Sequence, residues 1–203
     1  TGCVGQKTDG GTDMDGSFDP LWAGADGGLQ LAQAADSPFG EPIGKVAVAK
    51  GDAFVLHPDG SRVDDAEGGE IYQGDVVQTG GDGSIGLVFA DNTTFSLAEN
   101  GEMAIDELVY DPGAQEGKMA VDIVQGVFTF VSGHIAKTGV EAMVIKTPVA
   151  TIGIRGTSGG GRSGPEGSSN TITLLPDPDG TIGEMTIAND GGTQVLNQPN
   201  QTT

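Results

Sequence analysis

The feature that most constrains this chain is a series of short runs in which apolar and polar or small residues alternate. The clearest example alternates over residues 84–89 and again, after a short turn, over residues 93–97. An apolar side chain at every second position gives a β-strand one buried face. No stretch of ten or more residues repeats its apolar side chains every 3.6 residues. The sequence therefore predicts an all-β fold with under about one tenth helix.

Turn residues separate these runs. Of the 203 residues, 36 are Gly and 10 are Pro. Glycine adopts positive φ without steric cost, so we expect positive φ at several glycines that follow Asp or Asn, namely Gly60, Gly83, Gly101, Gly180 and Gly191. Inside the longest run, residues 119–131, Gly126 predicts a bulge or a corner.

We predict that the runs form short, stacked antiparallel strands in a solenoid-like or sandwich domain, followed by a C-terminal β-hairpin extension. Slipping such a strand by one residue would expose its whole apolar set. The expected core consists of Val46, Val48, Phe54, Val76, Ile85, Leu87, Phe89, Phe95, Leu97, Ile105, Val121, Ile123, Val127, Ile145, Val149 and Ile152.

The charge balance excludes some partners. With 9 Lys and Arg against 29 Asp and Glu, the formal net charge is -20. Such a chain repels phosphate backbones and anionic membrane surfaces, so we expect no nucleic-acid partner. No apolar run approaches the ~18 residues of a membrane span. Because Cys3 is the single cysteine, the chain has no internal disulfide. The tripeptide Thr-Gly-Cys resembles the end of a lipoprotein signal, so lipidation of Cys3 stays open, although the apolar part of such a signal is missing.

Composition divides the chain into five parts. We predict a Gly/Asp-rich leader over residues 1–40, a β domain over 41–156 and a flexible Gly/Ser linker over 157–169. The hairpin extension covers 170–197, and a polar tail covers 198–203.

The leader is too polar to fold alone, but it carries isolated apolar side chains. Two interpretations stay open: an unfolded leader, or a tail that docks on a protein surface. In the second, strand addition to an open sheet edge would let the leader enter a neighbouring copy and propagate a fibre. The candidate interaction residues are Leu21, Trp22, Leu29, Leu31 and Phe39.

No catalytic constellation is evident, and we expect no enzymatic activity. His57 and His134 are the only histidines, and their positions favour solvated loop side chains over a general base. A nucleophile elbow and a phosphate-binding loop are both missing from the sequence. Arg155, between an apolar strand and a glycine, favours a structural ion pair or contacts to backbone carbonyls over a functional contact.

A weak calcium site is the one metal candidate. Asp177 and Asp179 precede Gly180 as at the start of an EF-hand loop, but residue 188 is Ala where that loop needs a bidentate Glu. We predict at most a surface calcium site at these two carboxylates, and no other cofactor.

Residues 44–157 resemble the FecR domain, both in the residues of several short motifs and in the order of these motifs. The most specific string is Lys146-Thr-Pro-Val-Ala-Thr-Ile-Gly-Ile-Arg-Gly-Thr157. Shorter pieces that match are residues 44–46, 51–55, 74–80, 87–91 and 96–100. The resemblance implies an extracytoplasmic all-β domain of short stacked strands, as found in iron-signalling sigma regulators and in large exported surface proteins of Gram-negative bacteria.

The resemblance leaves two functions open. Sigma regulators carry a cytoplasmic segment and a membrane helix before this domain, whereas residues 1–40 contain neither. We therefore expect the exported variety: a cell-surface or extracellular assembly module that forms a homo-oligomer or fibre. The alternative is a signalling or retention module that binds another envelope protein, with the periplasm as its compartment.

Overall fold

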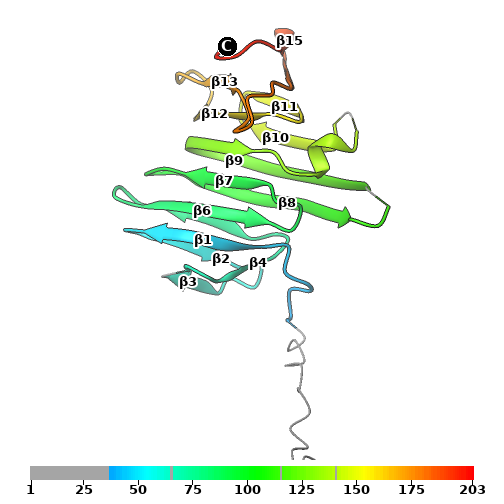
Figure 1. The fold of residues 1–203 in the computed structure, drawn as a ribbon. Helices are drawn as coiled ribbons and strands as arrows, with labels where there is room; N and C mark the ends of the chain where they lie inside the picture. The colour runs from blue at the N-terminus through cyan, green and yellow to red at the C-terminus, as the bar shows by residue number, and fades with distance from the viewer. Residues whose placement is uncertain (1–36, 65, 115, 140) are drawn as a thin grey trace, which may run out of the picture. The chain divides into compact units, whose positions relative to one another are not determined.

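The computed structural model describes residues 37–203 except residues 65, 115 and 140. Over these residues the regular structure consists of β-strands and one short 3-10 helix, η1 (Ile135–Lys137), which confirms the all-β prediction. None of its described helices is long and apolar enough to cross a membrane. The strands stack one above another from β3 and β4 at one end to β15 at the other (Figure 1).

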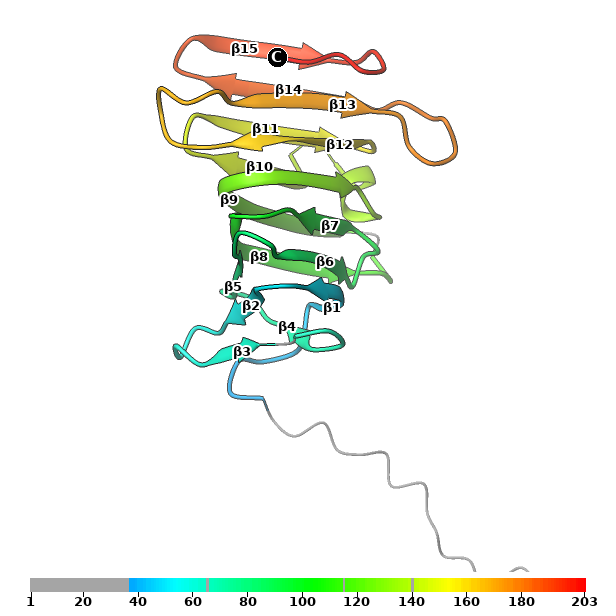
Figure 2. The same ribbon diagram turned by 90° about the vertical axis from the view of Figure 1, so that its left-hand side faces the viewer.

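The strands form two layers, which Figure 2 shows from the side. We call the first layer sheet A; in spatial order it contains β4 (Glu70–Ile71), β1 (Gly44–Lys50), β6 (Ser84–Phe89), β7 (Thr94–Leu97), the second part of β9 (Glu116–Val131), β12 (Ser158–Ser163) and β13 (Thr171–Leu175). The second layer, sheet B, contains β3 (Arg62–Asp64), β2 (Ala53–Leu56), β5 (Val76–Thr79), β8 (Glu102–Asp111), the first part of β9, β10 (Met143–Thr147), β11 (Ala150–Arg155), β14 (Glu184–Asn189) and β15 (Gly192–Leu196).

Strand β9 joins the two layers. Its first part pairs with β8 and β10 in sheet B, and its second part, from Gly126 onward, pairs with β7 and β12 in sheet A. Gly126 has φ +108, and a Cβ there would lie 2.6 Å from the Cα of Gly101. The predicted corner at Gly126 is therefore confirmed. The β9–β10 pair is parallel, so sheet B is mixed, whereas the strand pairs of sheet A are all antiparallel.

The predicted linker is instead part of sheet A. Residues 158–163 form β12, which pairs with β9 on one side and β13 on the other. A Cβ on Gly160 would lie 2.6 Å from the Phe128 carbonyl oxygen, and one on Gly159 would overlap the Met185 side chain of sheet B. The glycines of β12 thus permit close packing between strands and between layers. The prediction that residues 158–163 belong to a flexible linker was wrong.

Most predicted core residues are buried between the layers, but five are half-buried or exposed: Val48, Phe54, Val76, Val127 and Val149. The register of β1 shifts between Val46 and Val48, so both cannot face the core. Val127 follows the corner at Gly126 and points outward, leaving 46% of it exposed. Such bulges and corners reverse the alternation of a strand.

The C-terminal part continues both layers. Strand β13 pairs with β12 in sheet A, whereas β14 and β15 form the hairpin and extend sheet B. Beyond β15, the tail returns to sheet A, where Thr203 and Ile172 exchange two backbone hydrogen bonds of 3.0 Å.

Candidate functional site

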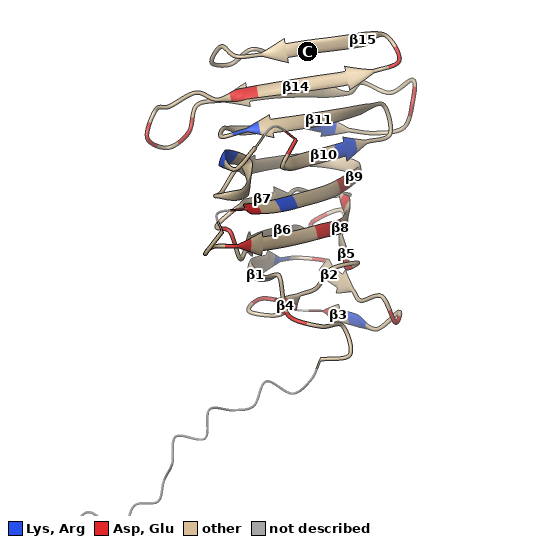
Figure 3. Cartoon of the chain, turned by 90° about the vertical axis from the view of Figure 1, so that its right-hand side faces the viewer, with Lys and Arg blue, Asp and Glu red and all other residues tan. Residues whose placement is uncertain are grey.

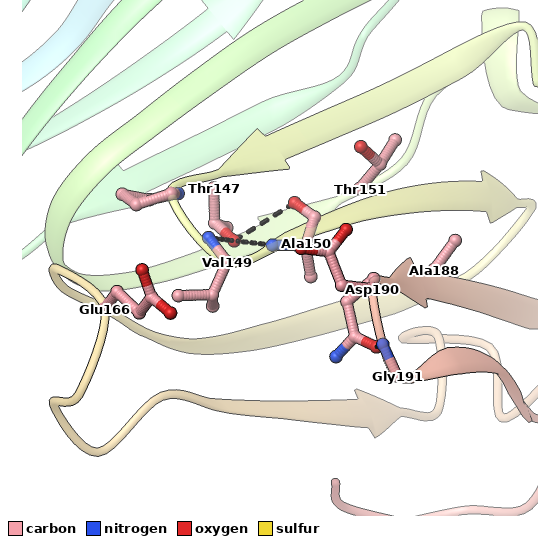
Figure 4. Close-up of a pocket in the computed structure, with 10 residues that line it drawn as sticks. Thr147, Val149, Ala150, Thr151, Glu166, Ala188, Asp190 and Gly191 are labelled. Carbon is pink, nitrogen blue, oxygen red and sulfur yellow. Dashed lines mark hydrogen bonds between the residues drawn. The ribbon is translucent and has the colours of Figure 1, made fainter.

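The FecR-like string at residues 146–157 forms β10, a two-residue turn and β11. Pro148 and Val149 are the turn, between the paired residues Thr147 and Ala150. The Thr147 Oγ1 accepts a hydrogen bond from the Ala150 N–H at 3.0 Å and donates one to the Ala150 carbonyl oxygen at 3.1 Å (Figure 4). A threonine before proline therefore closes this hairpin.

The string alternates between core and surface. Ile152 and Ile154 are buried at 0% and 1% exposure, so their neighbours Thr151, Gly153 and Arg155 belong to the outer face of sheet B. The pairing register places Gly153 between Val144 of β10 and Thr186 of β14. A Cβ on Gly153 would meet no atom closer than 3.9 Å, so crowding does not require this glycine.

A groove of about 330 Å³ lies on this outer face. Gly153 forms part of its lining, and the missing side chain deepens it. Glu141, at one side, has φ +62, a conformation rare for residues other than glycine. We call this the Arg155 groove; its lining includes Glu141, Val144, Thr151, Gly153, Arg155, Glu184 and Thr186.

Arg155 is exposed, and the described part of the chain provides it with no ion pair or side-chain hydrogen bond. The ion pair or backbone-carbonyl contacts expected for Arg155 are therefore not found among the described residues. Structural roles fall to the two residues after it. Gly156, with φ +55, leads the chain from sheet B toward sheet A, and Thr157 is fully buried. The Thr157 N–H donates to Ser132 Oγ at 2.9 Å, and its Oγ1 donates to the Leu175 carbonyl oxygen at 3.2 Å.

A second groove, of about 470 Å³, adjoins the first and shares Thr151 and Ala188 with it. Figure 4 shows its lining, which combines the β10–β11 turn with the β14–β15 turn and Glu166. Glu166 and Asp190 are the only charged residues in this lining. The two grooves together form a recess on the outer face of sheet B and along its adjoining turns, and concave surfaces of this kind are candidate binding sites.

A row of ion pairs borders the grooves on the same face. Lys146 Nζ lies 2.8 Å from Asp106 and 3.8 Å from Asp122. Partial burial, followed by repulsion from Asp106, raises the pKa of Asp122, whereas the hydrogen bond to Asp106 raises the pKa of Lys146. These pairs are largely exposed and contribute little to stability.

The two histidines differ from each other. His57 is not solvated: its Nδ1 lies 2.8 Å from Asp75, a fully buried carboxylate that also accepts the Tyr72 N–H at 2.8 Å. His134 is exposed, and its Nδ1 contacts the Asp91 carbonyl oxygen at 2.8 Å. Residues 57 and 75 are far apart in sequence, so no local pattern could have indicated their contact.

Of the predicted interaction residues, Leu21, Trp22, Leu29 and Leu31 lie outside the described residues, as does Cys3. Phe39 is described and half-buried. Its ring stacks on His57 with centroids 4.7 Å apart and contacts Tyr72 at 5.4 Å. Phe39 therefore packs on its own chain.

The two calcium candidates both accept hydrogen bonds within the chain. Asp177 accepts from Ser158 Oγ at 2.6 Å, and Asp179 accepts from the Thr181 N–H at 2.9 Å. The Thr181 bonds lower the pKa of Asp179. Across residues 37–203, apart from the three gaps, no group of three or more His, Cys, Asp or Glu side chains gathers in a way that could hold a metal ion. Calcium binding at Asp177 and Asp179 stays a prediction.

Comparison with solved structures finds similar chains. Two crystal structures of a candidate anti-sigma factor from Parabacteroides distasonis ATCC 8503, at 1.65 and 2.50 Å resolution, are similar to this chain with 12% identity and a TM-score of 0.48. The match covers 63% of this chain and 52% of that one, so the chain spans about half the length of that protein. No curated protein matches the sequence.

The sequence model of the FecR protein family matches residues 75–175. The match starts later than the expected β domain, and it includes β12 and β13, which the sequence analysis had assigned to a linker and an extension. This match confirms the resemblance: the chain carries a FecR domain at residues 75–175.

Proposed function

We propose that this chain is a non-enzymatic regulatory module of the cell envelope, which acts by binding another envelope protein through the outer face of sheet B. The FecR domain at residues 75–175 supports regulation over the fibre assembly that the sequence analysis favoured. The compartment, outside the cytoplasm, belongs to the same proposal.

One observation carries the choice of surface. The string most specific to FecR places Ile152 and Ile154 in the core, but its outward residues Thr151, Gly153 and Arg155 have no evident structural task. Arg155 makes no ion pair within the described ranges, although its planar guanidinium is well suited to a carboxylate of a partner. Exposed residues that the fold does not need are candidates for recognition.

Site-specific crosslinking in the bacterium that encodes the chain tests this proposal. A photoreactive amino acid replaces Thr151 in the Arg155 groove, and in a control it replaces Val127, which is 46% exposed on the sheet A part of β9. We expect Thr151 to crosslink to one envelope protein, identified by mass spectrometry, and Arg155→Glu to abolish the adduct. Equal adducts at both positions, or none at Thr151, would refute the proposed surface.

A transcript measurement separates regulation from assembly. Deletion of residues 75–175 should change a defined set of transcripts, and Arg155→Glu should reproduce that change. Fibre assembly remains the second candidate. It would instead leave transcripts unchanged and remove a surface structure visible by electron microscopy.

A further inference from the structure

The free edge of sheet B at its C-terminal end has an unusual composition for this chain. Among residues 37–203, apart from the three gaps, strand β15 pairs with β14 alone. Residues 191–203 contain no Lys, Arg, Asp or Glu, in a chain of net charge -20. Figure 3 shows β15 and the segment after it without charged residues. Exposed edge strands usually carry charges, proline or a cover that prevents pairing with another strand.

Two of the three other sheet ends have such protection. At the N-terminal end of sheet B, β3 carries Arg62 and Asp64, whose charged atoms lie 2.7 Å apart. At the C-terminal end of sheet A, the tail covers β13 through the backbone hydrogen bonds between Ile172 and Thr203. Strand β15 has neither a charge nor a backbone cover among the described residues.

The hairpin geometry shows which backbone groups are free. Asn189 and Gly192 close a two-residue turn, so the hydrogen-bonded pairs of β14 and β15 recur at every second residue from this pair. Gln194 and Leu196 therefore direct their N–H and C=O groups toward β14. Those of Thr193 and Val195 point to the open edge, and 44% of Val195 is exposed.

We propose that β15 is a strand-addition site and that its partner is β15 of a second copy of this chain, in an antiparallel pair. With the two-fold axis at Gln194, Thr193 of each copy lies opposite Val195 of the other. These two pairs exchange all the free N–H and C=O groups of both residues. They also bring two β-branched side chains together, a favourable cross-strand combination. Each Gln194 Oε1 already accepts a hydrogen bond from Thr203 Oγ1 of its own chain at 2.7 Å, which leaves the amide NH₂ to donate across the axis.

Charge identifies a second copy as the occupant. Two chains of net charge -20 repel each other, and this electrostatic repulsion is weakest where the two facing surfaces carry no charged residues. A basic partner would instead favour the acidic surfaces. Because the pairing is isologous, it uses the open edge of both copies and closes at a dimer rather than a fibre. This inference is independent of the proposed function, which concerns the Arg155 groove.

Sedimentation of the full chain over a range of concentrations tests the dimer. Val195→Pro removes an N–H that faces the edge, where proline does not disturb pairing with β14. Val195→Lys places a charge there. Either change should raise the dimer dissociation constant by about tenfold or more, whereas Val109→Lys, on β8, should leave it unchanged. A wild-type chain that stays monomeric at every concentration would overturn the proposal, as would a Val195→Pro chain that associates like the wild type.

A disulfide tests the register. In a Cys3→Ser background, Gln194→Cys places two thiols in a non-hydrogen-bonded pair with Cα atoms about 4.5 Å apart, within disulfide reach. Thr193→Cys is the matched control, because its two copies lie diagonally, about 9 Å apart. We expect a covalent dimer of the Gln194→Cys chain only. Equal crosslinking of both variants would refute this register, and species larger than dimers would favour a fibre.

Discussion

The glycines of β12 provide the sharpest test of the fold, because two interpretations predict opposite signs. If residues 157–169 were a flexible linker, Gly160→Ala would be neutral or would stabilise the chain by about 0.4–1 kcal/mol, since alanine lowers the entropy of the unfolded state. In the structure, Gly160 lies in a central strand, between β9 and β13. The substitution should therefore destabilise the fold.

The magnitude follows from the space around Gly160. A Cβ there would lie 2.6 Å from the Phe128 carbonyl oxygen and 3.0 Å from Thr129 Cγ2, whereas ordinary contacts begin at 3.4 Å. The oxygen belongs to a paired strand and cannot move alone. Overpacking of this kind costs about 1–3 kcal/mol. Because ~1 kcal/mol shifts the Tm of a chain of this size by about 2–4 °C, a mid-range cost of ~2 kcal/mol should lower the Tm of Gly160→Ala by about 4–8 °C.

Thermal unfolding of the full chain, followed by circular dichroism, measures this effect. Gly139→Ala is the matched control, because a Cβ on Gly139 would meet nothing within 4 Å and the residue has no positive φ. The control should unfold at or slightly above the wild-type Tm. If Gly160→Ala also unfolds at or above that temperature, the assignment of β12 as a packed strand is wrong.

Three further perturbations test other parts of the structure. Asp91→Ala should lower the free energy of unfolding by about 3 kcal/mol, because the buried carboxylate accepts hydrogen bonds from Thr93 N, Thr93 Oγ1 and Ile135 N; a loss under ~1 kcal/mol in urea titrations would contradict this role. Asp122→Asn should raise the Tm at pH 7, because the folded state raises the pKa of this carboxyl and so disfavours its charged form. That gain should vanish as the pH falls below the unfolded value of 3.8, and a gain independent of pH would exclude the ionic cause. Arg155→Glu should change stability by no more than about 0.5 kcal/mol, since the side chain is exposed; a larger loss would show a structural role.

Local alternation was sufficient to predict those strands whose apolar residues repeat at every second position. Strand β6 spans Ser84–Phe89, as the alternation indicated. The corner at Gly126 was also predictable, because a glycine inside a long strand commonly marks a bulge or a bend. By contrast, β12 has no apolar alternation: its sequence is Ser-Gly-Gly-Gly-Arg-Ser. Only the neighbouring strands explain why glycine is needed there.

The turn glycines were predicted only in part. Gly60 and Gly180 have positive φ, as expected. At the turn before Gly101, however, Asn100 takes the left-handed conformation with φ +55. Asparagine tolerates this region better than most residues. An Asn-Gly pair therefore indicates a turn but does not determine which of the two residues adopts positive φ.

Contacts between distant residues account for what the sequence could not predict of the site. Asp75 directly precedes β5, and it is fully buried and contacts His57 from a different turn. The residues next to Arg155 in the sequence could not show whether it forms an ion pair either. Its potential acidic partners lie on β14 and in the segment before β10. Pairing register across three strands determines both outcomes, and register depends on bulges that local patterns do not reveal.

The alternation of the FecR-like string separates its structural positions from its functional candidates. Ile152 and Ile154 fill the core, and Gly156 and Thr157 carry the chain between the sheets, so the fold itself explains why these residue types occur. Nothing in the packing explains Gly153 and Arg155: the glycine has open space above it, and the arginine is exposed. If the string served the fold alone, Gly153→Ala and Arg155→Glu would both be silent in the cell. A partner seated in the groove would instead make both changes harmful while the purified chains keep the wild-type Tm, and this combination of results separates binding from folding.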